Sequence, residues 1–254
     1  MAWRRGLAAW SGCAKEGGGV AEWYSVGVDL GQTNDWTAVA VVERAEETGE
    51  WDAAKFARRK VVTLQLRHLE RITRGTSYPQ VVKRVVEVTR CSALAGRCRL
   101  AVDGTGGGRP VVDLLRDARP GCVVMAVNIT SGLKETSDGG YYGVPKRDLI
   151  VGLQVLLQRG VLRIAAGLPE GAELVKEMAG MQVRISPSGN EQMAAWREGT
   201  HDDLVFAVAL ACWNAQNAYP NHPAGAEQWW TNEREAEAAR ILRGWAEGYA
   251  SRRR

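Results

Sequence analysis

The stretch "EWYSVGVDLGQTNDWTAVAVVE", residues 22–43, decides the fold of this 254-residue chain. Apolar residues dominate it up to Asp29, turn-forming residues follow, and a second apolar run begins at Trp36. This pattern predicts two strands joined by a tight turn, with Asp29 at the carboxyl end of the first strand. Residues 59–70 alternate in the same way and predict a third strand, which would complete an antiparallel meander.

The rest of the chain alternates between helical and extended patterns. Valines at helical spacing follow Pro79, and "CRLAVDGTG" is a short apolar strand that stops at Asp103. Further helices are expected within 109–118, 145–160, 169–180 and 204–213, strands at 122–130 and 161–167, a Gly-rich loop at 131–144, and a hairpin at 181–196 turning at 188–190. The order predicts an α/β fold in which three antiparallel strands are followed by alternating parallel strands and helices, with helices flanking the mixed sheet.

Composition favours one main domain at 23–218, preceded by a flexible leader at 1–22. A helical tail at 219–254 would follow, bearing Trp229, Trp230 and Trp245. The net charge of +4 suits a nucleic-acid partner without requiring one. The five cysteines form no CxxC pair, which indicates a reduced, cytoplasmic protein without structural zinc. No apolar run has the length of a membrane span, and no membrane partner is expected.

Four aspartates occupy positions suited to metal chemistry. Asp202 and Asp203 stand at the entrance of a helix that has no polar residue from Leu204 to Trp213, although one capping carboxylate would suffice there. Asp29 and Asp103 each end a strand, where open α/β sheets gather reactive groups. Carboxylates gathered at one edge repel one another unless a divalent cation joins them. The set therefore predicts two Mg²⁺ or Mn²⁺ ions, about 4 Å apart, acting in phosphodiester hydrolysis.

Three motifs in this order, "GVDLGQTNDWTAVAVVE", "LAVDGTGGG" and "HDDLVFAVALA", resemble the nuclease domain of the large subunit of tailed-phage terminases. The resemblance spans about residues 23–217 and implies a ribonuclease H-like fold. It also implies an endodeoxyribonuclease with Asp29, Asp103, Asp202 and Asp203 as catalytic metal ligands, although the sequence does not say which of the last two binds metal directly. Concatenated viral double-stranded DNA would be the substrate, cut in a bacterial host cell during packaging.

The chain departs from that family in two ways. Many members have a further acidic residue where this chain has Phe206. No G-x-x-x-x-G-K-[ST] motif is present, so we expect the ATPase motor to be a separate partner, together with a small terminase subunit and the portal.

Several neighbouring residues are candidates for supporting roles. Asp35 and His201 are possible second-layer groups around the metal site, and either one is equally explained as a turn or capping residue. The cations Lys134, Lys146 and Arg147 flank the Gly-rich loop and are possible contacts to the DNA backbone, with plain surface charge as the alternative. No organic cofactor is expected.

Three other functional interpretations of the sequence remain open. "VGVDLGQTND" also resembles the first phosphate loop of actin-like and chaperone ATPases, although the chain has room for only one such lobe after Asp103. Holliday-junction resolvases and transposases share the fold and the metal chemistry. A non-catalytic DNA-binding packaging subunit would not need four intact aspartates.

Overall fold

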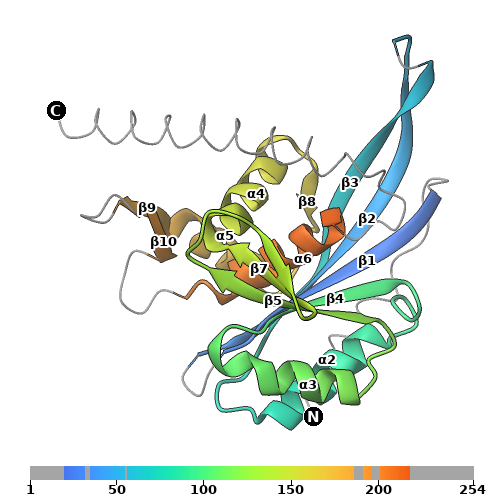
Figure 1. The fold of residues 1–254 in the computed structure, drawn as a ribbon. Coiled ribbons are helices and arrows are strands. Elements are labelled where there is room, and N and C mark those ends of the chain that lie inside the picture. Colours follow the sequence, from blue (N-terminus) through green and yellow to red (C-terminus); the bar gives the residue numbers. More distant parts are fainter. Residues whose placement is uncertain (1–19, 32–34, 55, 186–190, 196–200, 218–254) are drawn as a thin grey trace.

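The structure, a computed structural model, describes residues 20–31, 35–54, 56–185, 191–195 and 201–217 (Figure 1). Its centre is an eight-stranded mixed sheet with the strand order β6-β7-β5-β4-β1-β2-β3-β8. The strands are β1 Val20–Asp29, β2 Thr37–Asp52, β3 Ala57–Ile72, β4 Cys98–Asp103, β5 Val123–Thr130, β6 Thr136–Asp138, β7 Tyr141–Pro145 and β8 Leu162–Ile164. A separate two-stranded hairpin is formed by β9 Met181–Ile185 and β10 Glu191–Ala195.

The predicted meander and the parallel strands that follow it are confirmed. Strand β1 pairs antiparallel with β2, β2 pairs antiparallel with β3, and β4 runs parallel to both β1 and β5. Val28 lies opposite Val102 in the parallel pair, so Asp29 and Asp103 end neighbouring strands at the same edge of the sheet. The expectation that these two carboxylates share an edge is therefore correct.

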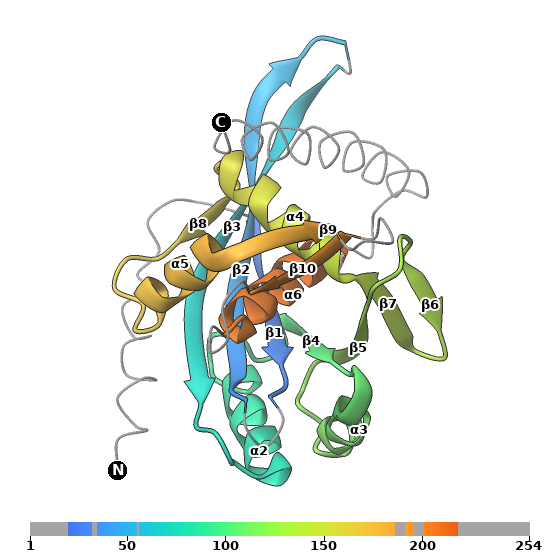
Figure 2. The same cartoon turned by 90° about the vertical axis from the view of Figure 1, so that its left-hand side faces the viewer.

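The second and third strands are longer than the sequence indicated. Strand β2 continues to Asp52 and β3 begins at Ala57, and together they form a hairpin that projects beyond the sheet (Figure 2). Pairing with β1 extends only to Glu46. Beyond that point both faces of the hairpin meet solvent, so its sequence is charged and lacks the apolar alternation that reveals a half-buried strand.

The segment 131–144 is not only a loop. It contains β6 and begins β7, which pair antiparallel with each other and add two strands to the sheet beside β5. The turn between them places Gly139 and Gly140 at φ angles of 55° and 81°, a conformation that glycine adopts without steric cost. The predicted Gly-rich loop is thus corrected to a hairpin.

Helices cover both faces of the sheet (Figure 1). One face carries α2 Tyr78–Thr89 and α3 Arg109–Asp117, with a short 3-10 turn, η3 Gly106–Gly108, before α3. The other face carries α4 Lys146–Gln158, α5 Gly171–Gly180 and α6 Asp203–Asn217. Each face has its own hydrophobic core. The residues of α6 from Asp203 to Ala215 are all buried, as the sequence predicted.

Gly27 allows α6 to lie directly on β1. A Cβ atom at this position would lie 2.1 Å from the carbonyl oxygen of Ala207 and 2.5 Å from the backbone nitrogen of Ala211, distances that no real side chain tolerates. The backbones of the strand and the helix therefore touch. This contact, two residues before Asp29, places the start of α6 beside the end of β1.

Several sequence predictions lie outside the described residues. They are the leader up to residue 19, the turn of the hairpin at 188–190, and the Trp-rich tail. Strand β1 begins at Val20, within the stretch assigned to the leader. Among the described residues, no helix is both long and apolar enough to cross a membrane.

Candidate metal centre

Asp103 is oriented by the turn that follows β4. Its Oδ1 accepts the backbone N–H of Thr105 at 2.8 Å and also accepts the Thr105 hydroxyl. The same hydroxyl oxygen accepts the N–H of Ile129 at 2.8 Å, which ties the turn to the end of β5. The neighbouring Asp29 side chain contributes a lowering of the Asp103 pKa. The two parallel strand ends thus bring their carboxyl groups close to each other.

Asp29 lies at the electrostatic centre of the acidic residues. Burial raises its pKa well above the ordinary value, and Asp103, Asp202 and Asp203 raise it further, in that order. Burial also raises the pKa of Asp103, against a lowering by its bonds to Thr105. The other three predicted aspartates therefore all act on Asp29. A site that favours protonation of Asp29 is also one in which added positive charge is strongly stabilising.

Lys146 places an ammonium group among these carboxylates. Its Nζ lies 3.5 Å from Asp202 Oδ2 and 4.5 Å from the centre of the Phe206 ring, and its charge lowers the pKa of both Asp29 and Asp103. Lys146 is the first residue of α4, directly after β7. It therefore faces the acidic site, although the sequence suggested only a contact to DNA.

Asp203 is held by partners that the sequence analysis missed. Its Oδ2 accepts a hydrogen bond from Arg71 Nε at 2.7 Å, and the same guanidinium bonds Glu177 of α5. Glu177 Oε2 accepts the backbone N–H of Val205 at 3.1 Å, which satisfies one of the free N–H groups at the start of α6. These contacts join β3, α5 and α6. Neither Arg71 nor Glu177 stands in a motif, so no local signal marked them.

Glu177 shares its single cation with Asp203. Burial, followed by the charge of Asp203, raises the pKa of Glu177 to about 8, and the opposing effect of Arg71 is smaller. Burial is the largest single effect on Arg71 and lowers its pKa, but the hydrogen bond to Asp203 and the charges of Asp203, Glu177 and Glu170 together raise the pKa above the ordinary value. One guanidinium thus lies between two buried carboxylates, and the raised pKa of Glu177 is the result.

The remaining candidate residues lie around this centre. His201 Nδ1 is 3.9 Å from Asp203 Oδ1, so His201 is beside the acidic site. Arg147 lies 3.6 Å from Asp148 on its own helix. Lys134 is exposed in the stretch before β6, and Asp35 is exposed in the turn before β2.

The donor set suits a hard divalent cation, because every candidate ligand is a carboxylate oxygen and the charge of Lys146 does not offset the effects that raise the pKa of the buried Asp29. The ammonium of Lys146 already occupies the position of a cation beside Asp202. Among the described residues, however, no three His, Cys, Asp or Glu side chains surround one point as a complete set of metal ligands. The carboxylates interact through space and are not arranged as a closed ligand shell.

Comparison with known families identifies the architecture. A model of the family described as "Terminase RNaseH-like domain" matches residues 26–215, which include the carboxyl end of β1, all four aspartates and nearly all of α6. The chain belongs to this family. The predicted resemblance to a terminase nuclease domain, and the ribonuclease H-like fold that it implied, are thereby confirmed.

Solved structures agree with this fold. The large terminase nuclease from thermophilic phage G20c is 21% identical, with a TM-score of 0.52 over 78% of this chain and 89% of that one. The same nuclease with bound magnesium is 21% identical, with a TM-score of 0.51 over 79% of this chain and 89% of that one. The large terminase nuclease domain of Thermus phage P74-26 is 19% identical, with a TM-score of 0.48 over 79% and 87% of the two chains. No curated protein sequence matches the chain significantly.

Proposed function

We propose that this terminase-family domain is a metal-dependent DNA endonuclease that cuts concatenated viral DNA during packaging. The observation that carries the proposal is the convergence of electrostatic effects from Asp103, Asp202 and Asp203 on the buried Asp29. The family membership and the magnesium bound by the similar G20c nuclease support it. Packaging would take place in the cytoplasm of a bacterial host, with translocation supplied by an ATPase motor that acts with a small terminase subunit and the portal.

In this proposal Asp29, Asp103 and Asp202 hold Mg²⁺ or Mn²⁺, and two ions are expected. When bound, such ions activate a water molecule and stabilise the leaving oxygen of a phosphodiester. Asp202 is the member of the acidic pair assigned to direct metal contact, because it is half-buried and, within the described residues, its ion pair is with the ammonium of Lys146 alone. Asp203 is committed to Arg71. Its role is to fix the start of α6 so that Asp202 faces Asp29 and Asp103.

Lys146 has two tasks that follow from its position. Its ammonium offsets the repulsion among the carboxylates, which keeps the site from distorting the ends of β1 and β4. A phosphate brought to the site would meet the same ammonium, and an ammonium next to a phosphodiester stabilises the charge that develops as the bond breaks. Lys134 and Arg147 remain proposed contacts to the DNA backbone farther from the site. His201 and Asp35 remain proposed supports of the metal centre.

The proposal is tested by nicking of supercoiled plasmid with Mg²⁺, Mn²⁺ or EDTA. The wild-type chain is compared with Asp29→Ala and with a matched control, Asp113→Ala, in which an exposed carboxylate on α3 is removed. Nucleotide hydrolysis is followed in parallel. We expect metal-dependent nicking that is lost in Asp29→Ala and kept in Asp113→Ala, without turnover of ATP. Hydrolysis of ATP that is lost in Asp29→Ala, with no nicking, would overturn the nuclease assignment in favour of an ATPase lobe.

A further inference from the structure

An exposed arginine, Arg74, and a half-buried tryptophan, Trp36, lie together beside the acidic site. The guanidinium carbon of Arg74 lies 4.9 Å from the centre of the Trp36 ring, and that of Arg71 lies 5.7 Å from the same ring. Trp36 directly precedes β2, and Arg74 follows the end of β3. Because Asp29 pairs with Ala38 and Ala38 pairs with Arg71, these residues lie at the same edge of the sheet as the metal centre.

The two arginines differ in how their charge is balanced. Arg71 is largely buried and binds Asp203 and Glu177. Arg74 is exposed, and within the described residues it has no carboxylate partner. Its interactions are with the Trp36 ring and with Nε2 of His201. Arg74 therefore carries a positive charge at the rim of the site that no acidic group of the described chain neutralises.

His201 sets the direction of the Arg74 side chain. A guanidinium can only donate, so Nε2 of His201 is the acceptor of their bond, and Nδ1 faces Asp203 Oδ1 at 3.9 Å. This contact uses one of the five N–H groups of Arg74 and leaves the others available. The planar fork, held between an aromatic ring and an imidazole, loses less side-chain entropy on binding a ligand than a mobile lysine does.

We infer that Arg74, Trp36 and His201 form a subsite for the DNA strand next to the metal centre, in which Arg74 binds a backbone phosphate and the Trp36 ring contacts the neighbouring sugar or base. The inference rests on the proposed nuclease function. DNA that approaches four carboxylates is repelled, and cations at the rim offset that repulsion. Lys146 contacts Asp202, and Arg74 reaches Asp203 through His201, so cations bracket the paired aspartates. Guanidinium forks match phosphate oxygens in pairs, and aromatic rings accept any base.

The test is binding of a fluorescent duplex DNA, measured by anisotropy over a series of salt concentrations in Ca²⁺. The variant is Arg74→Gln. The control is Arg97→Gln, which removes an exposed arginine that also lies over an aromatic ring, 5.8 Å from Tyr24, at the opposite edge of the sheet. Both variants change the net charge equally. The slope of log K against the logarithm of the salt concentration is negative, and loss of one phosphate contact makes it about 0.9 less steep.

We expect Arg74→Gln to weaken binding about 10- to 150-fold, as loss of a charge-assisted hydrogen bond does, and to make the slope about 0.9 less steep. Arg97→Gln should match the wild type. The slope also distinguishes loss of a phosphate contact from partial unfolding of the variant. A reduced folded fraction lowers the affinity equally at every salt concentration and leaves the slope unchanged. Equal slopes in Arg74→Gln and wild type, or equal losses in both variants, would overturn the subsite. If the wild type also fails to nick plasmid in Mg²⁺, the nuclease proposal fails as well, which separates the two failures.

Discussion

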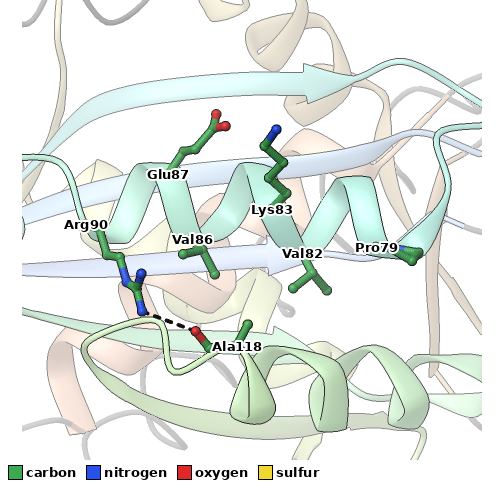
Figure 3. A pocket seen from close by; sticks show the side chains of 7 residues that line it. All are labelled: Pro79, Val82, Lys83, Val86, Glu87, Arg90 and Ala118. Atoms are coloured by element: carbon green, nitrogen blue, oxygen red, sulfur yellow. Dashed lines mark hydrogen bonds between the residues drawn. The ribbon is translucent and has the colours of Figure 1, made fainter.

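The two faces of the sheet bury similar apolar cores but treat charge differently. On the α2 and α3 face, a groove is lined by apolar residues such as Val82, Val86 and Ala118, and the side chains of Lys83 and Glu87 point away from α3 (Figure 3). Arg90 there donates to the carbonyl oxygen of Ala118 at 3.2 Å. On the α6 face, carboxylates are buried together. The α2 and α3 face therefore contributes to stability through apolar packing. On the α6 face, the buried carboxylates repel one another, and a bound cation would remove that repulsion.

The largest effect should come from removing the carboxylate of Asp202. We predict that Asp202→Asn lowers the rate of plasmid nicking at least about 100-fold, because metal-stabilised charge in the transition state is worth several kcal/mol. Thermal unfolding should occur at the same temperature or higher, since one source of repulsion is gone. A variant that retains the rate, or that melts far below the wild type, would contradict the assignment of Asp202 as a metal ligand. Asp113→Asn on the other face serves as the control.

The next effect concerns the buried ion pairs. Arg71→Met should lower the free energy of unfolding by about 3–5 kcal/mol, because it leaves Asp203 and Glu177 buried without their cation. On the opposite face, Arg90→Met should cost about 1 kcal/mol, the value of an exposed hydrogen-bonding group. Urea denaturation measures both. Similar losses in the two variants would show that the faces do not differ in the way described.

A smaller effect is expected at the contact between β1 and α6. Gly27→Ala places a Cβ against the backbone of Ala207 and Ala211, and such overpacking costs about 1–3 kcal/mol. The control is Gly180→Ala, because a Cβ at Gly180 meets no atom within 4 Å. Thermal melts compare the two. If Gly27→Ala melts at the wild-type temperature, the backbones of β1 and α6 are not in the close contact described.

The last predicted effect is a change in how the stability depends on pH. The pKa of Glu177 is raised from 4.5 to about 8 on folding, so the folded state binds more protons and loses stability as pH rises from about 4.5 to 8. Asp29, whose pKa is also raised, adds a loss of the same sign. Glu177→Gln should therefore flatten the fall in stability over this range, as measured by urea denaturation at several pH values in EDTA. An unchanged pH profile would contradict this interpretation of Glu177.

The sequence predicts the parts of the molecule that rest on local patterns. Apolar runs ending at Asp29 and Asp103 locate two strand ends, and the apolar run after Asp203 locates a buried helix. The sequence could not reveal the roles of Arg71 and Glu177. Arg71 lies 132 residues before Asp203 and 106 residues before Glu177, and only folding brings the three side chains together. The projecting hairpin was missed for a related reason, since strands exposed on both faces lack apolar alternation.

The central claim, that the ends of β1, β4 and α6 form a divalent metal site, is tested most directly by calorimetric titration of Mn²⁺ into the wild-type protein and into Asp29→Asn. The account predicts saturable binding to the wild type and loss of that binding in Asp29→Asn, because Asp29 is the carboxylate on which the other three act. Binding of equal strength and stoichiometry in both proteins would contradict the claim and place any metal site elsewhere.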